Sequence, residues 1–510
     1  MRSGRCTNFG SCATADTQQT VKLADMADLV CPECKRALTE TSRSSQPGSP
    51  SSTLVLAATF LLLLLLCGSG YFLFKRLTLS PSTRSAASAP VPALPISGSV
   101  FLRLSGSNTI GSQLAPALAA AFLKQEGATG IQSYFGSEDS KVSGVFPDGN
   151  RVIEIHAHGS ATAFTELASG SADIGMASRK INSAEESQLS ALGDMTSPAS
   201  EHVLGLDGIA VIVNRANPVA SLSKEQIAGL FSGEIANWSG VSGTDGPVRV
   251  YARDAKSGTF DTFKSLVLKD RPLRSGAERF EDSQKLSDAV SNDVNAIGFV
   301  GLPYVASSKA VAVSEKGARA LLPNRFTVST EDYLLSRRLF LYTASNPKPA
   351  VRRFVDFALS KAGQDIVAAN GFVEQNVRAE SAAPAPASSP HYQSITSGAQ
   401  RLSLDFRFRS GSSQLDNKAL ADLDRVTSFL SDLRYSGGSV MLLGFSDSTG
   451  AAAANVALSK DRAKAVADQF AQRGAQPGLV TGFGPEMPIA ANDNEDGRQK
   501  NRRVEIWVRK

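Results

Sequence analysis

The chain has 510 residues, and at roughly 150 residues per domain this length predicts about three domains rather than a single core. The composition is 42% hydrophobic and 20% charged, with 42 Gly and 23 Pro, which excludes wholesale disorder, a collagen-like repeat and a protein with many membrane spans. A net charge of +5 is small for this length, so the sequence predicts no nucleic-acid partner.

All five cysteines precede residue 68, which indicates that the N-terminus and the rest of the chain occupy different redox compartments. Cys6, Cys12, Cys31 and Cys34 form a Cys-x5-Cys and a Cys-x2-Cys pair, a pattern typical of a tetrahedral zinc site. We therefore predict a zinc-ribbon-like cytoplasmic segment over residues 1–45, with structural zinc as its cofactor. Two disulfides, or an unmetallated redox-sensitive tail, are the alternatives.

Residues 53–74 form a run of 22 residues without a charged side chain. As a helix this run would be about 33 Å long, which matches the hydrocarbon core of a bilayer. We predict one retained transmembrane helix, because no small-x-small cleavage site follows the run and a long polar segment precedes it. Lipoprotein-type processing at Cys67 is an alternative. Three basic residues on each side leave the orientation undecided by charge.

Two stretches rich in Ser, Ala and Pro have the composition of linkers. The first covers residues 75–98 and the second residues 379–397. They delimit a body at residues 99–378 and a terminal domain at residues 398–510.

The body alternates short apolar strands with amphipathic helices, which predicts an α/β fold. Three of its strands end in Gly- and hydroxyl-rich turns that lead into a helix, at residues 105–109, 156–162 and 252–259. Such a turn exposes backbone N–H groups at the positive end of a helix dipole. One turn alone is an ordinary helix cap, whereas three together indicate oxyanion binding.

These turns carry a resemblance to the PstS-like phosphate-binding proteins, the periplasmic receptors of ABC importers. The resemblance is carried by five segments: SGSNTIG (105–111), HGSATA (158–163), SADIGMASRKI (171–181), FSGEIANW (231–238) and RDAKSGTFDTF (253–263). It implies a two-lobed, type II periplasmic-binding-protein-like fold that closes over an oxyanion, with phosphate as the ligand and an ABC permease as a partner. The implied oxyanion-binding residues are Ser107, Thr109, Ile110, Ser160, Arg179, Arg253, Ser257, Gly258 and Thr259.

Arg179 departs from the pattern, because some of these receptors carry Asp there. An arginine would favour a more negative ligand or form a salt link across the lobes, so selectivity between phosphate and sulfate stays open. His156 and His158 lie beside the implied site, and we expect them to be packing or capping groups rather than metal ligands. The sequence shows no nucleophile with a base and an orienting group, which predicts that the protein is not an enzyme.

The terminal domain reads as alternating strands and helices, a small α/β sandwich. It resembles the OmpA-like peptidoglycan-binding domains through Gly444–Gly450, Asn455, Arg462, Gly497-Arg498 and Asn501–Glu505. Phe445 and Ser446 replace the usual His-Thr. The resemblance implies that Asp447 and Arg462 bind the ammonium and carboxylate of diaminopimelate, and Asn455 shares a helix face with Arg462.

A plain Asp/Arg salt bridge is the alternative for Asp447 and Arg462. We expect Arg498, Arg502 and Arg503 to brace the last strand or to contact the wall peptide. Wall binding would place the body in the periplasm, on a single-pass inner-membrane protein with a cytoplasmic N-terminus. The sequence thus predicts a membrane-anchored protein that binds an oxyanion and, non-covalently, peptidoglycan. The alternative is an envelope-organising protein whose body is an interaction scaffold without a solute.

Overall fold

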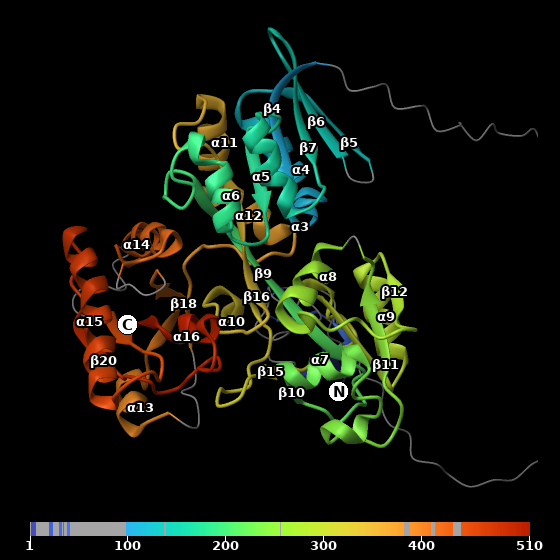
Figure 1. Cartoon of the computed structure of the whole chain (residues 1–510), viewed down its shortest axis with the longest axis vertical. Coiled ribbons are helices and arrows are strands. Elements are labelled where there is room, and N and C mark those ends of the chain that lie inside the picture. The colour runs from blue at the N-terminus through green and yellow to red at the C-terminus, as the bar shows by residue number, and fades with distance from the viewer. Residues whose placement is uncertain are drawn as a thin grey trace, which may run out of the picture. The chain divides into compact units, whose positions relative to one another are not determined.

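The computed structural model describes residues 2–6, 20–23, 30–32, 34, 38–40, 98–136, 139–255, 257–381, 388–409, 414–431 and 440–509 (Figure 1). Residues 1–39 and 96–510 form one compact unit. Cys12, the predicted span at residues 53–74 and nearly all of the linker at residues 75–98 lie outside the described residues. In the described part of the chain, no helix is both long enough and apolar enough to cross a bilayer.

The body has two lobes. The first lobe contains β4 (Ser99–Gly106), α3 (Asn108–Gly111), α4 (Leu114–Gln125), β5 (Thr129–Phe135), β6 (Asp139–Phe146), β7 (Gly149–His156), α5 (Ser160–Ser169), β8 (Ile174–Ala177) and α6 (Ser183–Gln188). Two helices from later in the chain, α11 (Pro349–Leu359) and α12 (Lys361–Ala369), complete it. Phe122 of α4 packs against Phe354 and Phe357 of α11 in its core.

The second lobe contains β10 (Ser221–Ser223), α7 (Lys224–Ser232), β11 (Arg249–Arg253), α8 (Gly258–Phe263), β12 (Glu278–Phe280), α9 (Ser283–Asn292), β13 (Ala296–Gly301), β14 (Lys309–Ala310), β15 (Ala312–Ser314) and α10 (Arg325–Ser329). Local sequence defines where its helices begin. Ser223 and Gln226 form a capping box on α7, and Asp282 accepts a hydrogen bond from Lys285 N at the start of α9. The rings of Phe231, Phe263 and Phe299 pack together in its core.

Two long strands connect the lobes: β9 (Glu201–Val213) and β16 (Ser336–Tyr342) (Figure 1). β9 pairs antiparallel with β16 along its first half and with β13 along its second half. As a result the sheet order is β12-β11-β13-β9-β16-β8-β4-β7-β6-β5, with β14 added on β9. The carboxyl ends of β4 and β11, and the helices α3 and α8 that follow them, therefore face each other between the lobes.

The C-terminal domain is a five-stranded sheet in the order β17-β18-β21-β19-β20. Its strands are β17 (Ala379–Glu380), β18 (Gln400–Arg407), β19 (Val440–Gly444), β20 (Leu479–Gly482) and β21 (Arg503–Val508). Helices α14 (Asn417–Leu430) and α15 (Ala452–Gln472) bury one face of the sheet through Leu402, Leu442 and Ile506. Shorter helices α13 (Pro390–Thr396) and α16 (Glu495–Asn501) complete the predicted α/β sandwich.

The segment predicted as the second linker contains structure at both of its ends. Residues 379–380 form β17, which pairs with β18, and α13 places Tyr392 among Phe445, Phe483 and Trp507. Tyr392 also donates a hydrogen bond of 2.7 Å to Glu505 on β21. These described residues belong to the C-terminal domain rather than to a free tether.

Charged side chains alternate with apolar ones along β18, and this polar face is buried against the second lobe. Arg401 donates to Asp332 at 2.9 Å and to Asp405 at 2.7 Å, and all three side chains are almost fully buried. Arg338 of β16 contacts Glu331 and, across the domain boundary, Asp416 at 2.7 Å. The C-terminal domain is therefore joined to the second lobe by a buried ionic cluster.

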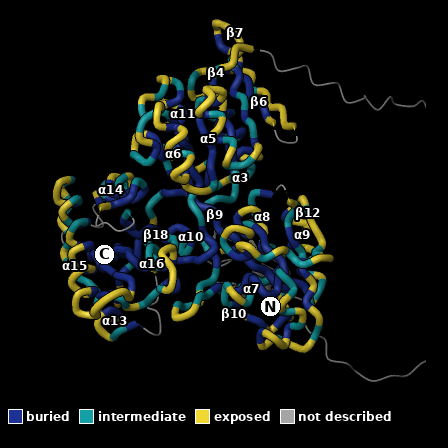
Figure 2. Tube along the Cα trace, viewed as in Figure 1, coloured by how far each residue is buried: buried dark blue, intermediate teal, exposed yellow. Residues whose placement is uncertain are grey.

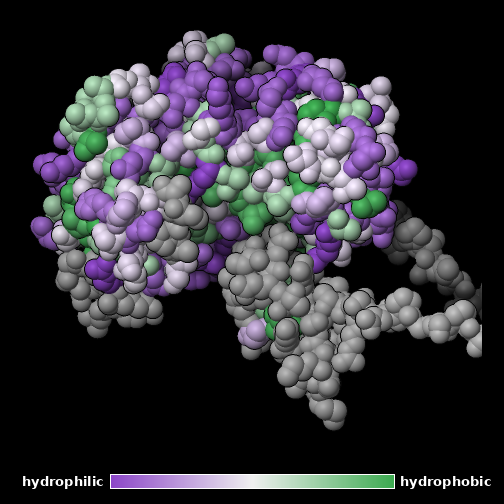
Figure 3. Space-filling view, turned by 90° about the horizontal axis from the view of Figure 1, so that it is seen from below, coloured by the Kyte–Doolittle hydropathy of each residue, from purple (hydrophilic) through white to green (hydrophobic). Residues whose placement is uncertain are grey.

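The burial pattern follows this architecture. Figure 2 shows the central strands, such as β9, buried, while strands at the two ends of the body sheet and the outer turns of the helices are exposed. On the face shown in Figure 3, most described residues are hydrophilic and the hydrophobic ones lie in small separate groups. That face of the described chain thus resembles an ordinary solvent-exposed surface.

The N-terminal segment contributes β1 (Arg2–Arg5), β2 (Thr20–Leu23) and β3 (Thr39–Glu40), and β1 pairs antiparallel with β2. Cys6, Cys31 and Leu38 are buried in a hydrophobic cluster with residues of β9, β13 and α9 in the second lobe. This packing differs from the expectation that the cysteine segment and the body lie on opposite sides of a membrane.

Candidate functional site

A cavity of about 420 Å³ lies between the two lobes and brings together five of the predicted oxyanion ligands. Thr109 enters it from the first lobe, and Arg253, Ser257, Gly258 and Thr259 enter it from the second. Thr109 follows Ser107 and Asn108 at the end of β4, and Ser257 caps α8 by accepting a hydrogen bond from Phe260 N. The N-terminal ends of α3 and α8 therefore direct backbone N–H groups into this cavity from opposite lobes.

The lobes touch at the inner end of this cavity. A Cβ atom on Gly258 would lie 1.8 Å from Thr109 Oγ1, so only a glycine fits there. Arg337 of β16 bridges the contact, because its Nη2 donates to Thr109 Oγ1 at 2.8 Å and to Gly258 O at 2.9 Å. Asp207 of β9 holds this guanidinium with an ion pair of 3.2 Å. Burial lowers the pKa of Arg337, and the charge of Asp207 offsets part of that effect.

Arg337 and Asp207 were not predicted from the sequence. Both belong to long apolar strands, and they meet only because β9 and β16 pair side by side. The available signal was a charged residue inside each apolar strand, since a buried charge needs a partner.

Arg253 lines the cavity, but three of its five N–H groups donate to the protein. Its Nε donates to Phe280 O at 3.1 Å, its Nη1 to Ser283 Oγ at 2.5 Å and its Nη2 to Glu281 O at 2.7 Å. Burial lowers the pKa of Arg253, and nearby Asp254 partly opposes this effect. An anion in the cavity would therefore bind the N–H groups that these contacts leave over, or draw the guanidinium away from its partners.

Carboxylates are numerous around the same cavity. Asp207, Asp254, Glu281 and Asp282 all contribute to its lining. A fully ionised anion would be repelled by them, whereas an oxyanion that keeps a proton can donate a hydrogen bond to a carboxylate.

The remaining predicted ligands lie apart from the cavity lining. Ser107 is buried and donates its N–H to Met176 O, and Ile110 N donates to Ser107 O. Ser160, at the start of α5, contacts Ser178 with an Oγ–Oγ distance of 3.1 Å. Arg179 forms a two-point ion pair with Glu185 of α6, which raises the pKa of Arg179.

Arg179 instead lines a second cavity of about 390 Å³ that Arg338 and Lys500 also border. Burial and the nearby charge of Arg407 lower the pKa of Lys500 to about 8. The salt link expected from Arg179 is thus formed within the first lobe and does not cross between the lobes.

The C-terminal domain forms a second candidate site where β19 leads into α15. Asp447 accepts hydrogen bonds from Thr449 N at 2.9 Å and from Arg502 Nη1 at 3.1 Å. Asn455 of α15 donates to Thr449 O at 3.1 Å, so Asp447 and Asn455 hold the same turn. Burial raises the pKa of Asp447, but these hydrogen bonds and the charge of Arg502 outweigh it and keep the pKa below its usual value.

Arg462 lies about two helical turns after Asn455, on the same face of α15, and is 5% exposed. Its Nε and Nη1 atoms are buried and have no hydrogen-bond partner among the described residues. Burial lowers its pKa, and the charge of Arg502 lowers it further. A buried guanidinium with unused donors is suited to an incoming carboxylate, which would supply the missing hydrogen bonds.

Arg502 joins this site through ion pairs that the sequence did not predict. It was expected to brace the last strand or to contact the wall peptide, whereas it pairs with Asp447 and also with Glu495 of α16. The plain salt bridge weighed for Asp447 is therefore made with Arg502, and no ion pair joins Asp447 to Arg462 in the described structure.

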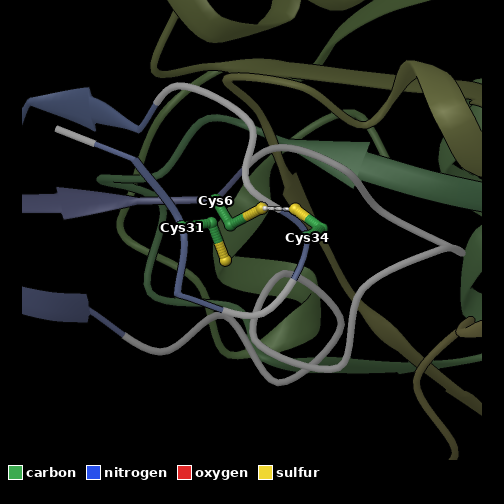
Figure 4. Close-up of side chains that lie close together, drawn as sticks. All are labelled: Cys6, Cys31 and Cys34. Atoms are coloured by element: carbon green, nitrogen blue, oxygen red, sulfur yellow. Dashed lines mark hydrogen bonds between the residues drawn. The ribbon is translucent and has the colours of Figure 1, made fainter. Parts of the chain in front are cut away.

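The N-terminal cysteines form a third cluster. The sulfur atoms of Cys6, Cys31 and Cys34 lie within 4.8 Å of one another, and Cys6 Sγ is 3.4 Å from Cys34 Sγ (Figure 4). Thiolates around a tetrahedral zinc ion lie about 3.8 Å apart, so these three positions fit the ligands of such an ion. The fourth predicted ligand, Cys12, lies outside the described residues.

Comparison with known proteins identifies both domains. Residues 91–362 match a family described as a PBP superfamily domain, and residues 407–502 match the OmpA family. The phosphate-binding protein PstS of Pseudomonas aeruginosa is 29% identical over 296 residues, which cover 52% of this chain and 90% of that protein.

Two solved structures are similar to separate parts of the chain. An ABC-type phosphate transport receptor from Vibrio cholerae is 25% identical and covers 53% of this chain and 99% of its own, with a TM-score of 0.42. The periplasmic domain of Helicobacter pylori MotB is 25% identical and covers 22% of this chain and 74% of its own, with a TM-score of 0.19. Because one family accounts for more than half of its 510 residues, this chain belongs to the PBP superfamily, with an OmpA domain at its C-terminus.

Proposed function

We propose that the body binds an oxyanion, phosphate in particular, in the cavity between its lobes. The observation that carries this proposal is the meeting of Thr109 with Arg253 and the Ser257–Thr259 turn in one cavity. The PstS protein of Pseudomonas aeruginosa, which matches the body, is named as a phosphate-binding protein, and this supports the same ligand. Binding would be non-covalent, through charge-assisted hydrogen bonds between the anion and donors from both lobes.

The carboxylates in the lining favour phosphate over sulfate. At neutral pH phosphate still carries an O–H group that can donate a hydrogen bond to the carboxylate of Asp207 or Asp254, whereas sulfate has no such group. We infer that a protonated oxyanion separates the Arg253 guanidinium from its partners and exchanges those hydrogen bonds for its own.

Calorimetry on the full-length protein in detergent tests this proposal. We expect phosphate to bind with a Kd of about 1 µM or tighter and Arg253→Ala to weaken binding by at least about tenfold. The matched control is Arg353→Ala, which removes an exposed arginine paired with Glu126 in the first lobe. Absence of heat at millimolar phosphate, or equal binding by both variants, would overturn the assignment.

We propose further that the C-terminal domain binds peptidoglycan through diaminopimelate. In this proposal Asp447 takes the ammonium group, Arg462 takes the carboxylate, and Asn455 keeps the turn around Asp447 in place. The Nε and Nη1 atoms of Arg462, which have no hydrogen-bond partner in the part of the chain that the structure describes, support it.

Sedimentation with purified sacculi tests the wall-binding proposal. Asp447→Ala and Arg462→Ala should each leave the protein in the supernatant, since either change removes one pole of the zwitterion clamp. The control Arg473→Ala changes the C-cap residue of α15, the helix that carries Arg462. This variant should pellet like the unaltered protein. Pelleting of both site variants would refute the clamp.

We propose a single-pass inner-membrane location, with the anchor at residues 53–74, a cytoplasmic N-terminus and both domains in the periplasm. Phosphate, peptidoglycan and, in a transport role, an ABC permease would be its partners. The contact of Cys6 and Cys31 with the second lobe opposes a cytoplasmic N-terminus, so the topology needs a direct test. Alkaline phosphatase, which is active only outside the cytoplasm, should be inactive when fused before Met1 and active when fused after Lys510. Activity of the fusion before Met1 would place the N-terminus outside the cytoplasm.

We also propose that Cys6, Cys12, Cys31 and Cys34 hold one structural zinc ion. Protein purified without added metal should then contain equimolar zinc, and a zinc chelator should raise its count of reactive thiols by about four. If the chelator leaves the number of reactive thiols unchanged, the cysteines form disulfides or an unmetallated tail.

A second candidate function is supported by the contacts at the cavity. Three of the five N–H groups of Arg253 bind protein acceptors, and Arg337 ties Thr109 to Gly258 across the lobes. These contacts are consistent with a body that acts as a scaffold for other envelope proteins without binding a solute. A calorimetric blank with phosphate, sulfate and arsenate, together with normal sacculus binding, would favour this candidate.

A further inference from the structure

Two histidines and one aspartate converge at the edge of the first lobe, where the β6–β7 ladder ends. His156 Nδ1 lies 2.8 Å from Asp139 Oδ1, and His158 Nε2 lies 3.0 Å from the same oxygen. All three ligand atoms lie within 4.8 Å of one another. The chain has four histidines, so half of them meet at this one carboxylate.

Backbone structure holds these residues in place. Asp139 and His156 are direct cross-strand partners at one end of the β6–β7 ladder. The loop after β7 is fixed to the turn between β4 and α3. Asn108 Nδ2 donates to Ala157 O at 2.5 Å, and Gly159 N donates to Gly106 O at 2.8 Å. His158 is therefore presented from a loop with hydrogen bonds on both sides of it.

The side chains are partly open to solvent, with exposed fractions of 31% for His156, 37% for His158 and 54% for Asp139. The two rings stack with their centroids 6.3 Å apart, and neither ring is buried. The packing or capping role expected from the sequence therefore does not explain why both rings turn to one carboxylate oxygen.

We propose that Asp139, His156 and His158 form a binding site for a divalent transition-metal ion of the zinc class. Imidazole nitrogen and carboxylate oxygen are standard zinc ligands, with bonds of about 2.0 to 2.2 Å. Ligand atoms in such a tetrahedral site lie about 3.3 Å apart, which is within a few tenths of an ångström of the two distances measured here. Small movements of three partly exposed side chains admit the ion.

Three protein ligands leave one tetrahedral position for water or an exchangeable anion. The site is separate from the cavity between the lobes, since none of its three residues lines that cavity. The proposal therefore stands or falls independently of phosphate binding. The competing explanation is a pair of histidine–aspartate hydrogen bonds with no affinity for metal.

Metal titration of the full chain distinguishes the two explanations. The five cysteines are first replaced by serine, because thiolates would compete for the metal; these positions are Cys6, Cys12, Cys31, Cys34 and Cys67. We expect one equivalent of Co²⁺ to bind, with d–d absorption bands and no sulfur charge-transfer band. Zn²⁺ should displace it stoichiometrically, since zinc binds nitrogen and oxygen ligands more tightly than cobalt.

His156→Ala, His158→Ala and Asp139→Asn should each weaken Co²⁺ binding at least tenfold. His391→Ala, which removes a histidine of α13, should bind like the parent. Circular dichroism of each metal-free variant should match the parent, which separates loss of a ligand from loss of the fold. A parent that binds no Co²⁺ at 100 µM metal, or site variants that bind like His391→Ala, would overturn the proposal.

Discussion

Gly258 leaves no room for a side chain where the two lobes meet. A Cβ atom at this position would clash with Thr109 Oγ1 at 1.8 Å and approach Thr109 N at 2.9 Å. Both atoms belong to the first turn of a helix in the opposite lobe, so neither can move away freely. The size of one residue therefore sets how closely the lobes approach.

We expect Gly258→Ala to lower the free energy of unfolding by about 1 to 3 kcal/mol, the usual cost of overpacking. Urea denaturation measures this loss. The second variant Thr109→Gly on the same chain should recover part of it, because the closest clashing atom is then gone. Gly301→Ala is the matched control, since its Cβ would meet nothing closer than 3.8 Å. A loss of equal size in the control would show that the contact with Thr109 is not the cause.

Strand β18 differs from an ordinary strand of a two-layer sandwich because its second face is both charged and buried. Arg401, Asp405 and Arg407 alternate with Leu402, Leu404 and Phe406, which pack under α14 and α15. Asp332 of the second lobe supplies negative charge to this face, with Arg401 at 2.9 Å and Arg407 at 3.6 Å. Removal of this carboxylate leaves buried guanidinium groups without sufficient counter-charge.

Asp332→Asn should therefore destabilise the protein by about 3 kcal/mol or more, as is found when one partner of a buried ion pair is removed. The double variant Asp332→Asn with Arg401→Gln should regain part of that loss. Asp365→Asn breaks an exposed pair with Lys361 on α12 and should change stability by at most about 0.5 kcal/mol. Denaturant titrations of these variants give the comparison, and equal effects of the two single substitutions would contradict it.

At the scale of the whole molecule, Glu331, Arg338 and Asp416 tie the second lobe to the C-terminal domain. Arg338 binds Glu331 at 2.9 Å on one side and Asp416 at 2.7 Å on the other, and Asp416 also caps α14. Burial by itself raises the pKa of Glu331, but the charges of Arg338, Arg407 and Lys418 outweigh it and lower the pKa to about 2.

A carboxylate whose pKa is lower in the folded state stabilises the fold above its unfolded pKa and loses that contribution on acidification. Glu331 should thus contribute on the order of 3 kcal/mol at pH 7, and this contribution should fade between about pH 4.5 and pH 2. Glu331→Gln should be less stable than the parent at pH 7 and close to it near pH 2. Glu278→Gln, on an exposed part of β12, is the control. A deficit in Glu331→Gln that is equally large at pH 2 would contradict the assignment.

Local motifs were sufficient to predict much of this architecture. The turns after β4 and β11 indicated an α/β body with oxyanion-binding helix starts, because each is a short strand–turn–helix unit with recognisable residues. The two lobes, and a common ligand for Thr109 and Ser257–Thr259, were implied by the resemblance to the PstS-like receptors, and the Gly444–Gly450 segment carried the resemblance of the C-terminal sandwich.

Long-range partners could not be predicted in the same way. The pair Arg337 and Asp207 depends on the register of β9 with β16, and the pair Asp447 and Arg502 joins residues 55 positions apart in the sequence. The contact between β18 and Asp332 depends on how two separately folded sheets dock. Composition alone suggested a slack connection at residues 379–397, because packing of Tyr392 against Trp507 leaves no local signature.

The buried charged face of β18, which carries Arg401, Asp405 and Arg407, has a mechanical consequence. If the C-terminal domain binds the wall as proposed, a load applied at Asp447 and Arg462 would pass through the sheet into Asp332 and Arg338, and from there into β16, the strand that carries Arg337 to the contact between the lobes. Tension on the wall would then act on that contact through the buried ion pairs of the domain boundary.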